Sequence, residues 1–348
     1  PKMWFAASFM VVFGAHFSAI WITAANSWMQ TPAGYELQAL PEPARAVMTD
    51  FWATVFTPSF VTRLLHVFFA SWTAGAALVA SVGAWYILRK PEHADLGKAC
   101  LGIALPFFIL FSVLNGTIFG PESARSVAEN QPEKLAAMEG IWQTEENAPA
   151  YVVGWVDEGS GETIGIAIPG LLSFLSGAET VTGINDFEVP PTLANLTFQS
   201  YHLMVGLGMA IIPFALLAAG LWFWKRKLLE HRWALWIVVS SVFVALFVIT
   251  RGWWEAEFGR QPWIVYGLMF TVDGTSPIVE AWEIVTSLAG FVLIYILLLV
   301  LFLYLLNRKI QRGPAPLEEV ESTPVDALPD TLRGIFAARG RGEERMTR

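Results

Sequence analysis

The segment EAEFGRQPW, which begins at Glu255, places two carboxylates and a guanidinium directly after a long apolar stretch. Charges near the end of a membrane helix cost about 2–3 kcal/mol unless they are paired, ligating or hydrated. Glu257 and Arg260 share one face if the helix continues, and Pro262 is expected to end it at Gln261. The cluster is therefore either an Arg–Glu pair that anchors a helix at the membrane interface or a carboxylate that binds a cofactor metal.

His66 and Met204 form a second candidate pair. Each lies about one turn inside an apolar stretch, and both stretches are expected to start on the same side of a membrane. Small residues follow in both stretches, which allows a neighbouring helix or a flat cofactor to approach closely. His and Met together are a standard axial ligand set for six-coordinate, electron-transferring haem iron. The alternative is a hydrogen-bonded His and an apolar Met inside a packed core.

The other histidines offer weaker candidates. His202 lies two residues before Met204 and is a rival ligand, although residues two apart face different sides of a helix. His16 lies within an apolar stretch, and we favour a helix–helix hydrogen bond over ligation there. Cys100 is the only cysteine of the sequence, so neither a disulfide nor a cysteine-based metal site is expected from this chain alone.

The composition indicates a membrane protein. Of the 348 residues, 55% are hydrophobic and only 15% are charged, and no nucleic-acid signature is evident. A bilayer is crossed by about 20 residues of helix, and lipid cannot pair with exposed backbone groups. We therefore predict an all-α, polytopic membrane helix bundle with about six transmembrane helices, at residues 3–26, 62–88, 98–119, 199–223, 233–250 and 282–306.

The charges predict an orientation. Basic residues cluster in the connections 88–98 and 225–232 and after the last span, which is typical of the cytoplasmic side. The long loop 120–198 is then outside. Between residues 121 and 197 it carries twelve acidic and two basic residues, and Pro132 is expected to start a short helix.

This interpretation divides the chain into two parts. Residues 1–312 form the expected transmembrane domain, and residues 313–348 form a polar, charged tail that is expected to be disordered and cytoplasmic. The chain opens almost inside an apolar stretch without an initiator Met, so we expect sequence to be missing upstream.

The motif GRQPW resembles the signature of subunit I of the cytochrome bd ubiquinol oxidases. Further similarity follows in the same order along the chain, in FSAIWITAANSWMQTP, LLHVFFAS, EKLAAMEGIW and HLMVGLG. The match covers nearly the whole chain up to the tail. The family has nine helices in this subunit, and this chain resembles the last six. The resemblance implies that the missing part carries the histidine ligand of one high-spin haem and acidic residues of a proton path.

The resemblance implies haem ligands. His66 and Met204 match the axial ligands of a low-spin haem b, and Glu257 matches the carboxylate ligand of a high-spin haem, whereas Glu255 is expected to be a helix-end charge. Arg260 matches the signature arginine, expected near the haems and their propionates, because a guanidinium is a permanent, forked donor to carboxylates. The implied cofactors are a low-spin haem b, a high-spin haem b, and haem d or a haem b that replaces it.

The resemblance also implies a quinol site. Lys134 and Glu139 match loop residues implicated in quinol oxidation. Pro121 stands where relatives can carry an acidic residue, and His202 stands where an arginine is common. At these two positions the chain departs from the family pattern, so the resemblance does not predict the fine tuning of the quinol site and the haem site.

The implied function is that of subunit I of a terminal respiratory quinol oxidase in the bacterial cytoplasmic (inner) membrane. A membrane quinol, ubiquinol or menaquinol, is oxidised on the outer face, and O2 is reduced to water at a di-haem site, which generates proton-motive force. The implied partners are a second membrane subunit (subunit II) and a small accessory subunit. One alternative is a non-catalytic or incomplete fragment of such an oxidase. Another is an ion-coupled membrane transporter, although the pseudo-symmetric halves typical of transporters are not evident.

Overall fold

The computed structural model describes residues 2–38, 45–224, 226–276 and 278–313. The expected tail, 313–348, lies outside this part of the chain except for Gly313. Within the described residues, six helices are long and apolar enough to cross a membrane. The predicted class, a helical membrane protein, is therefore confirmed.

The chain divides into two units at residues 277 and 278, and each is described by itself. The long helices of the first unit are α1 (Lys2–Gln30), α3 (Phe60–Arg89), α4 (Ala94–Leu114), α8 (Ala194–Phe223) and α9 (Arg232–Phe258). The second unit contains α10 (Ala281–Arg312), which begins with a capping box formed by Glu280 and Glu283.

Several helices are longer than the apolar stretches that predicted them. α9 runs to Phe258, eight residues beyond the expected end at 250. α4 continues through a π-helical turn, η2 (Asn115–Phe119), into α5 (Gly120–Asn130), so the first residues of the expected loop are helical. The length of an apolar stretch reports only the part of a helix that lies inside the membrane. Polar residues that favour helix, such as Glu and Arg, extend the helix beyond the membrane.

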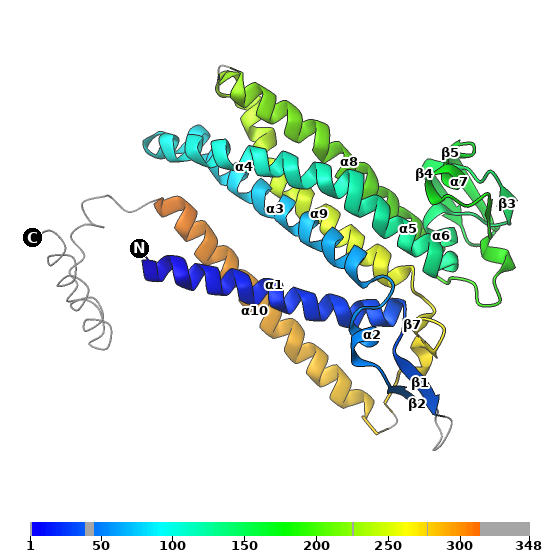
Figure 1. Ribbon diagram of the computed structural model, residues 1–348. Helices are drawn as coiled ribbons and strands as arrows, with labels where there is room; N and C mark the ends of the chain where they lie inside the picture. The colour runs from blue at the N-terminus through cyan, green and yellow to red at the C-terminus, as the bar shows by residue number, and fades with distance from the viewer. Residues whose placement is uncertain (1, 39–44, 225, 277, 314–348) are drawn as a thin grey trace, which may run out of the picture. The chain divides into compact units, whose positions relative to one another are not determined.

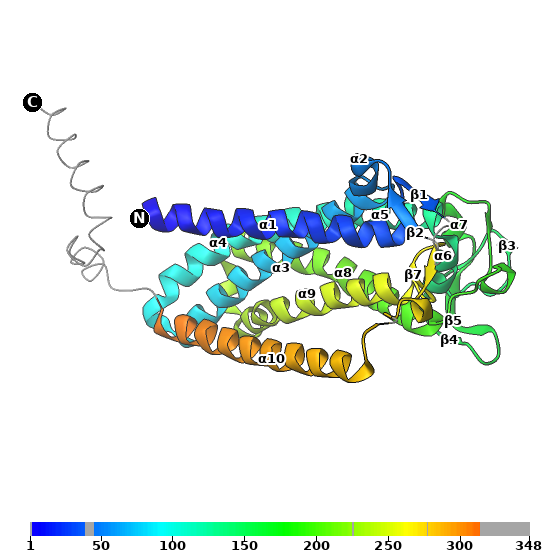
Figure 2. The same ribbon diagram turned by 90° about the horizontal axis from the view of Figure 1, so that it is seen from below.

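Helices α3, α4, α8 and α9 lie side by side in both ribbon views (Figures 1 and 2). Their contacts are made largely by small residues. A Cβ atom at Gly97 would lie 2.6 Å from the carbonyl oxygen of Gly83, so α3 and α4 cross with their backbones nearly touching. The main core cluster joins all four helices through Ala80, Ala84, Leu101, Ala104, Leu105, Ala218, Ala219, Trp222, Leu235 and Val238.

The segment between α5 and α8 folds into a small domain. It contains α6 (Pro132–Glu139), β3 (Glu145–Glu146), β4 (Ala150–Asp157), β5 (Glu162–Ile168), α7 (Leu171–Ser176) and β6 (Thr180–Val181). β4 pairs with β5 and β3 with β6, both antiparallel. α6 is the predicted short helix, with Pro132 in its first turn and Gly140 at its end with φ of 67°.

The remaining short elements lie in the other two connections on the same side of the helices. They are the hairpin β1 (Tyr35–Gln38) and β2 (Arg45–Met48), the helix α2 (Phe51–Val55), and the pair β7 (Trp263–Val265) and β8 (Met269–Phe270). Four 3-10 turns complete the described chain, at Pro91–His93, Ile184–Asp186, Lys227–Glu230 and Thr271–Asp273.

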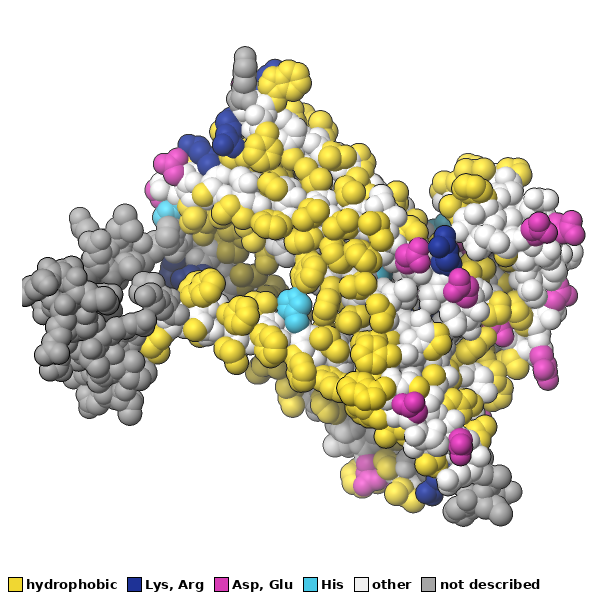
Figure 3. All heavy atoms as spheres, in the orientation of Figure 1, with side chains coloured by type: hydrophobic (Ala, Val, Ile, Leu, Met, Phe, Trp, Pro, Cys, Tyr) yellow, Lys and Arg dark blue, Asp and Glu magenta, His cyan; other side chains and the backbone are white. Residues whose placement is uncertain are grey.

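Charge is distributed unevenly along the first unit. We call the side that carries the 132–193 domain the loop end. Acidic side chains gather over the loop end, and basic side chains gather where α3 meets α4 and where α8 meets α9 (Figure 3). The basic residues of these two turns are Arg89, Lys90, Lys98, Arg226 and Lys227. The described part of the chain therefore shows the charge separation that the sequence predicted.

Candidate functional site

Three elements meet at the loop end through buried amide side chains. Gln30, the last residue of α1, donates from Nε2 to the carbonyl oxygen of Ala256 on α9 at 2.9 Å. Gln131, which precedes α6, donates from Nε2 to Oε1 of Gln30 at 3.0 Å. Because buried polar groups are stable only when they are hydrogen-bonded, this chain of bonds fixes the ends of α1, α6 and α9 together.

A buried ion pair lies beside these amides. Nζ of Lys134 is 3.1 Å from Oε1 of Glu255, and the two side chains are 4% and 10% exposed. Burial lowers the pKa of Lys134, and the charge of Glu255 opposes that shift. A Cβ atom at Gly259 would lie 2.9 Å from Cε of Lys134, so this glycine makes room for the lysine. Glu255 lies in the last turn of α9, as expected, but it is also a buried partner of Lys134, which the sequence did not predict.

Glu257 occupies a different environment from Glu255. Its Oε1 accepts a hydrogen bond of 2.8 Å from Nδ2 of Asn26, and its Oε2 is paired with Arg260. The spacing of Glu257 and Arg260 predicted this pair. Arg63 of α3 donates to Oδ1 of Asn26 and joins the same network. The Glu257 side chain is still 38% exposed, so its carboxylate retains acceptor capacity for a further ligand.

Arg260 is buried, yet part of its guanidinium has no partner. Among the described residues, Nε and Nη1 make no hydrogen bond. Burial lowers the pKa of Arg260, and the Glu257 carboxylate opposes the shift. A buried guanidinium with free donors suits a carboxylate-bearing ligand, because its planar fork matches two carboxylate oxygens. The haem propionates that the family resemblance implies are such carboxylates.

His66 lies on α3 opposite the π-helical turn. Its Nδ1 is buried and has no hydrogen-bond partner among the described residues, and the same is true of Oδ1 of Asn115 within the turn. A Cβ atom at Gly120 would lie 3.7 Å from Cε1 of His66. Single π-helical turns occur frequently at functional sites. A buried histidine with an unsatisfied ring nitrogen fits the ligand role better than the role of a hydrogen-bonded core residue.

Met204 lies on α8 and faces α9. A Cβ atom at Gly252 would lie only 2.8 Å from Sδ of Met204, so the glycine leaves the space that the thioether occupies. Helices α3 and α8, which carry His66 and Met204, both pack against α9. α9 also carries Glu255 and Glu257 in its last turns.

The two other candidate histidines have protein partners on both ring nitrogens. Nδ1 and Nε2 of His202 lie 2.9 Å and 2.7 Å from the carbonyl oxygens of Phe198 and Tyr151. Nε2 of His16 accepts a hydrogen bond from Trp72, and its Nδ1 lies 2.8 Å from the carbonyl oxygen of Val12. A metal ligand needs a free nitrogen lone pair, so the structure supports packing roles for both histidines.

Glu139 ends α6 in a buried position. Burial raises the pKa of Glu139 to about 7, and the neighbouring Tyr201 side chain opposes the shift. Tyr201 lies on α8, so Glu139 links the short helix to the helix that carries Met204. A carboxyl group with a pKa near neutrality is suited to accepting and releasing protons.

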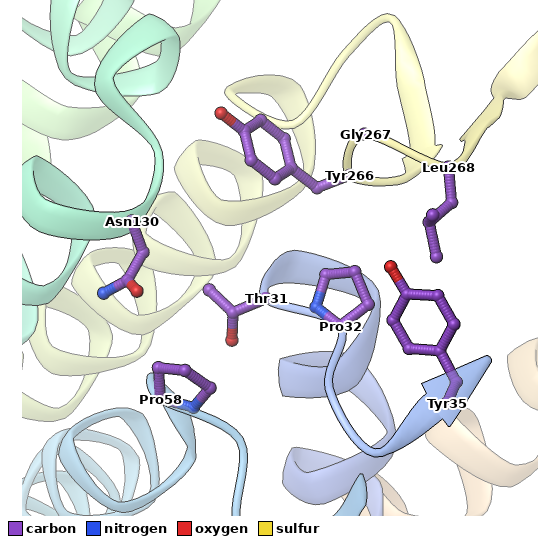
Figure 4. Close-up of a pocket in the computed structure, with 8 residues that line it drawn as sticks. All are labelled: Thr31, Pro32, Tyr35, Pro58, Asn130, Tyr266, Gly267 and Leu268. Atoms are coloured by element: carbon purple, nitrogen blue, oxygen red, sulfur yellow. The ribbon is translucent and has the colours of Figure 1, made fainter. Parts of the chain in front are cut away.

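A pocket of about 290 Å³ opens at the loop end (Figure 4). Tyr266 lies between the pocket and α6: its hydroxyl group donates to Glu133, and its backbone N–H donates to the carbonyl oxygen of Met29 at 2.9 Å. The pocket is lined by Thr31, Pro32, Tyr35, Pro58, Asn130, Tyr266, Gly267 and Leu268.

Sequence reasoning missed three residues of this region and the partner of a fourth. Asn26 donates a hydrogen bond to Glu257, and Arg63 donates in turn to Asn26. Tyr201 lies against Glu139, and Glu255 pairs with Lys134. A polar or charged side chain inside an apolar helix was the available signal, because such residues rarely occur without a partner. Their partners come from distant segments, which the spacing along one helix cannot reveal.

Comparison with known proteins bears on this geometry. The family profile described as "Cytochrome bd terminal oxidase subunit I" matches residues 1–314. The chain belongs to this family. It is 33% identical over 323 residues to "Cytochrome bd ubiquinol oxidase subunit 1" of Bacillus subtilis (strain 168), covering 87% of this chain and 67% of that protein. It is 28% identical to "Cytochrome bd-II ubiquinol oxidase subunit 1" of Escherichia coli (strain K12), covering 91% and 74%.

A second B. subtilis relative, "Putative cytochrome bd menaquinol oxidase subunit I", is 34% identical and is covered over 62% of its length. The chain also resembles a solved bd oxidase from Geobacillus thermodenitrificans with a TM-score of 0.77 and 31% identity, covering 87% of this chain and 69% of that one. The chain therefore spans about two thirds of the length of these relatives. Membership places it among the respiratory membrane oxidoreductases rather than the transporters.

Proposed function

We propose that the chain acts as subunit I of a terminal respiratory quinol oxidase. The observation that carries the proposal is the presence of two ion pairs at the loop end, Lys134 with Glu255 and Arg260 with Glu257, in which every side chain except that of Glu257 is buried. Burying a charge costs free energy of folding because the charge loses its hydration, and buried charges are concentrated at functional sites. Family membership supplies the reaction class, and the two B. subtilis relatives are named for ubiquinol and menaquinol.

The loop end is the proposed site of quinol oxidation. The Lys134 ammonium is the donor that holds a quinol oxygen, and Glu139 is the base that accepts a quinol proton. A group with a pKa of about 7 can take a proton at the pH of the outer compartment and return it to water. The balanced reaction converts two quinols and one O2 into two quinones and two waters. The quinol protons are released on the loop side, and an equal number of protons is taken up from the opposite side to form the waters.

The residues present also fit the haem groups that the family carries. His66 and Met204 would hold a low-spin haem b, Glu257 would bind a high-spin haem, and Arg260 would pair with propionates. The supporting observations are the unsatisfied Nδ1 of His66 and the free donors of the buried Arg260. When bound, these haems supply the one-electron transfer and the O2 chemistry that protein side chains lack. The second high-spin haem is haem d or a haem b.

The proposed setting is the bacterial cytoplasmic membrane, with the 120–198 loop outside and the tail inside. The proposed partners are subunit II and a small accessory subunit, together with O2 and the membrane quinol. The charge separation of the first unit supports this orientation, because basic turns remain on the cytoplasmic side.

Quinol-dependent oxygen consumption by the purified complex tests the proposal. Ubiquinol-1 and menadiol are added separately to the detergent-solubilised complex, and oxygen uptake is recorded. We expect oxygen uptake with at least one donor, at two quinols consumed per O2. A complex that retains its haems but consumes no oxygen with either quinol would show that the proposed activity is wrong.

A further inference from the structure

We infer that Glu255 is a positioning residue for Lys134, holding its ammonium group in the orientation that receives a quinol oxygen. The inference rests on the proposed function, because it concerns the same quinol site. It assigns a role to a carboxylate that the sequence left as a helix-end charge. Glu255 comes from α9 and Lys134 from α6, so the pair exists only in the folded chain.

A purely stabilising role does not explain the pair. Removing two charges from water costs several kcal/mol per ion, and buried ion pairs are often matched or exceeded in stability by apolar residues of similar volume. Both side chains are almost completely buried. The chain therefore keeps a charge at this position that stability alone does not favour, which points to a use for the ammonium group.

The geometry leaves the ammonium group partly free. Oε1 of Glu255 is 3.1 Å from Nζ of Lys134, but it forms no aligned hydrogen bond. The second contact of Nζ, with the carbonyl oxygen of Ala256, is long at 3.5 Å. An ammonium group has three donors. Lys134 is thus held by charge while retaining donor capacity for a ligand oxygen.

The lysine stem is fixed by its surroundings. Its Cγ and Cε each lie 2.9 Å from the position that a Cβ atom at Gly259 would occupy, so the stem lies directly on the backbone just after α9. The adjacent amides, Gln30 and Gln131, are already committed to each other and to Ala256. Among the described residues, Glu255 is the carboxylate in direct contact with the ammonium group, whereas Glu257 acts on it without an ion-pair contact, so Glu255 sets where the ammonium group points.

Four variants of the complete oxidase complex test the inference: Lys134→Met, Glu255→Gln, Glu255→Asp and the double variant Lys134→Met/Glu255→Gln. The matched control is Glu122→Gln, which breaks an exposed ion pair with Arg125 outside the cluster. The measurements are kcat and KM for ubiquinol-1, the Kd for ubiquinone-1, and oxygen uptake with ascorbate and tetramethylphenylenediamine, a small donor that bypasses the quinol.

We expect Glu255→Gln to raise the KM for ubiquinol-1 and the Kd for ubiquinone-1 about tenfold, while the bypass activity stays within about twofold. Glu255→Asp, which keeps the charge, should recover most of the loss. The double variant should be no worse than Lys134→Met, because a residue that acts through another adds nothing once its partner is gone. The control should behave like the parent.

Two results would overturn the inference while leaving the proposed function intact. One is an unchanged KM in Glu255→Gln alongside a raised KM in Lys134→Met. The other is a double variant whose losses multiply, which would give Glu255 an independent role. If Lys134→Met itself leaves quinol oxidation unchanged, the proposed quinol site is wrong. If the Glu255→Gln complex does not accumulate, Glu255→Asp tests the inference instead. We expect its KM for ubiquinol-1 to rise about threefold.

Discussion

Individual charged residues differ in how far the sequence could predict them. The pairing of Glu257 with Arg260 follows from their spacing on one helix, and the structure shows it. The pairing of Lys134 with Glu255 joins residues more than a hundred positions apart, and no spacing rule predicts it. Local periodicity reports neighbours on one helix, whereas the partner of a buried charge is chosen by tertiary packing.

The proposed acid–base role of Glu139 gives a prediction at the residue scale. A base must be ionised, and burial raises the pKa of Glu139 to about 7. We therefore expect kcat/KM for ubiquinol-1 to rise about tenfold between pH 6 and pH 8, as the ionised fraction grows. Tyr201 is the titratable group that faces Glu139. The Glu139→Gln variant should lose this rise and have a low rate throughout.

The same shift has a cost in stability. The folded chain keeps the Glu139 proton up to about pH 7, whereas an unfolded glutamic acid releases it near 4.5. The unfolded state then binds fewer protons, so the contribution of this group to stability falls as pH rises across that window. For the kinetic prediction, the control is Glu122→Gln, which should keep the rise of kcat/KM with pH. A Glu139→Gln variant that also keeps the full rise of kcat/KM would refute the assignment of Glu139 as the base.

Helix packing explains what the sequence predicted well and what it did not. Six long helices followed from apolar length, but their ends did not, because α4 continues through a π-helical turn into the polar α5. Gly120, the residue that follows that turn, lies against His66. The sequence shows glycines such as Gly252 only as small residues. It does not reveal which residue packs against them, which for Gly252 is Met204.

The α8–α9 contact gives a prediction at the element scale. In Gly252→Ala, the new Cβ atom would lie 2.8 Å from Sδ of Met204. A free Met side chain is flexible and moves aside at little cost. A thioether held by iron cannot move without losing the bond. We expect normal accumulation and thermal stability but a changed low-spin haem spectrum in the reduced-minus-oxidised difference.

Gly206→Ala is the matched control, because a Cβ atom at Gly206 would have no neighbour within 4 Å. It should leave the low-spin spectrum unchanged. If Gly252→Ala has the parental spectrum as well, Met204 is not fixed on a haem, and the packing alternative for this methionine is favoured.

At the scale of the whole molecule, the charge distribution of the first unit predicts its orientation. In a Cys100→Ala background, we expect Ser160→Cys at the tip of the β4–β5 hairpin to react with a membrane-impermeant maleimide added to intact cells. Both Ser160 and Glu92 are exposed side chains. Glu92→Cys, in the α3–α4 turn, should react only after the membrane is opened. The reverse pattern would invert the proposed topology.

The central claim is that buried side chains at and near the loop end serve a haem-bearing quinol oxidase. The reduced-minus-oxidised absorption spectrum of the purified His66→Ala complex tests it most directly, with His16→Ala as the control for losing an intramembrane histidine. We expect the low-spin haem b band to disappear in His66→Ala and to persist in His16→Ala, with the high-spin bands retained in both. A low-spin band that survives unchanged in His66→Ala would contradict the account.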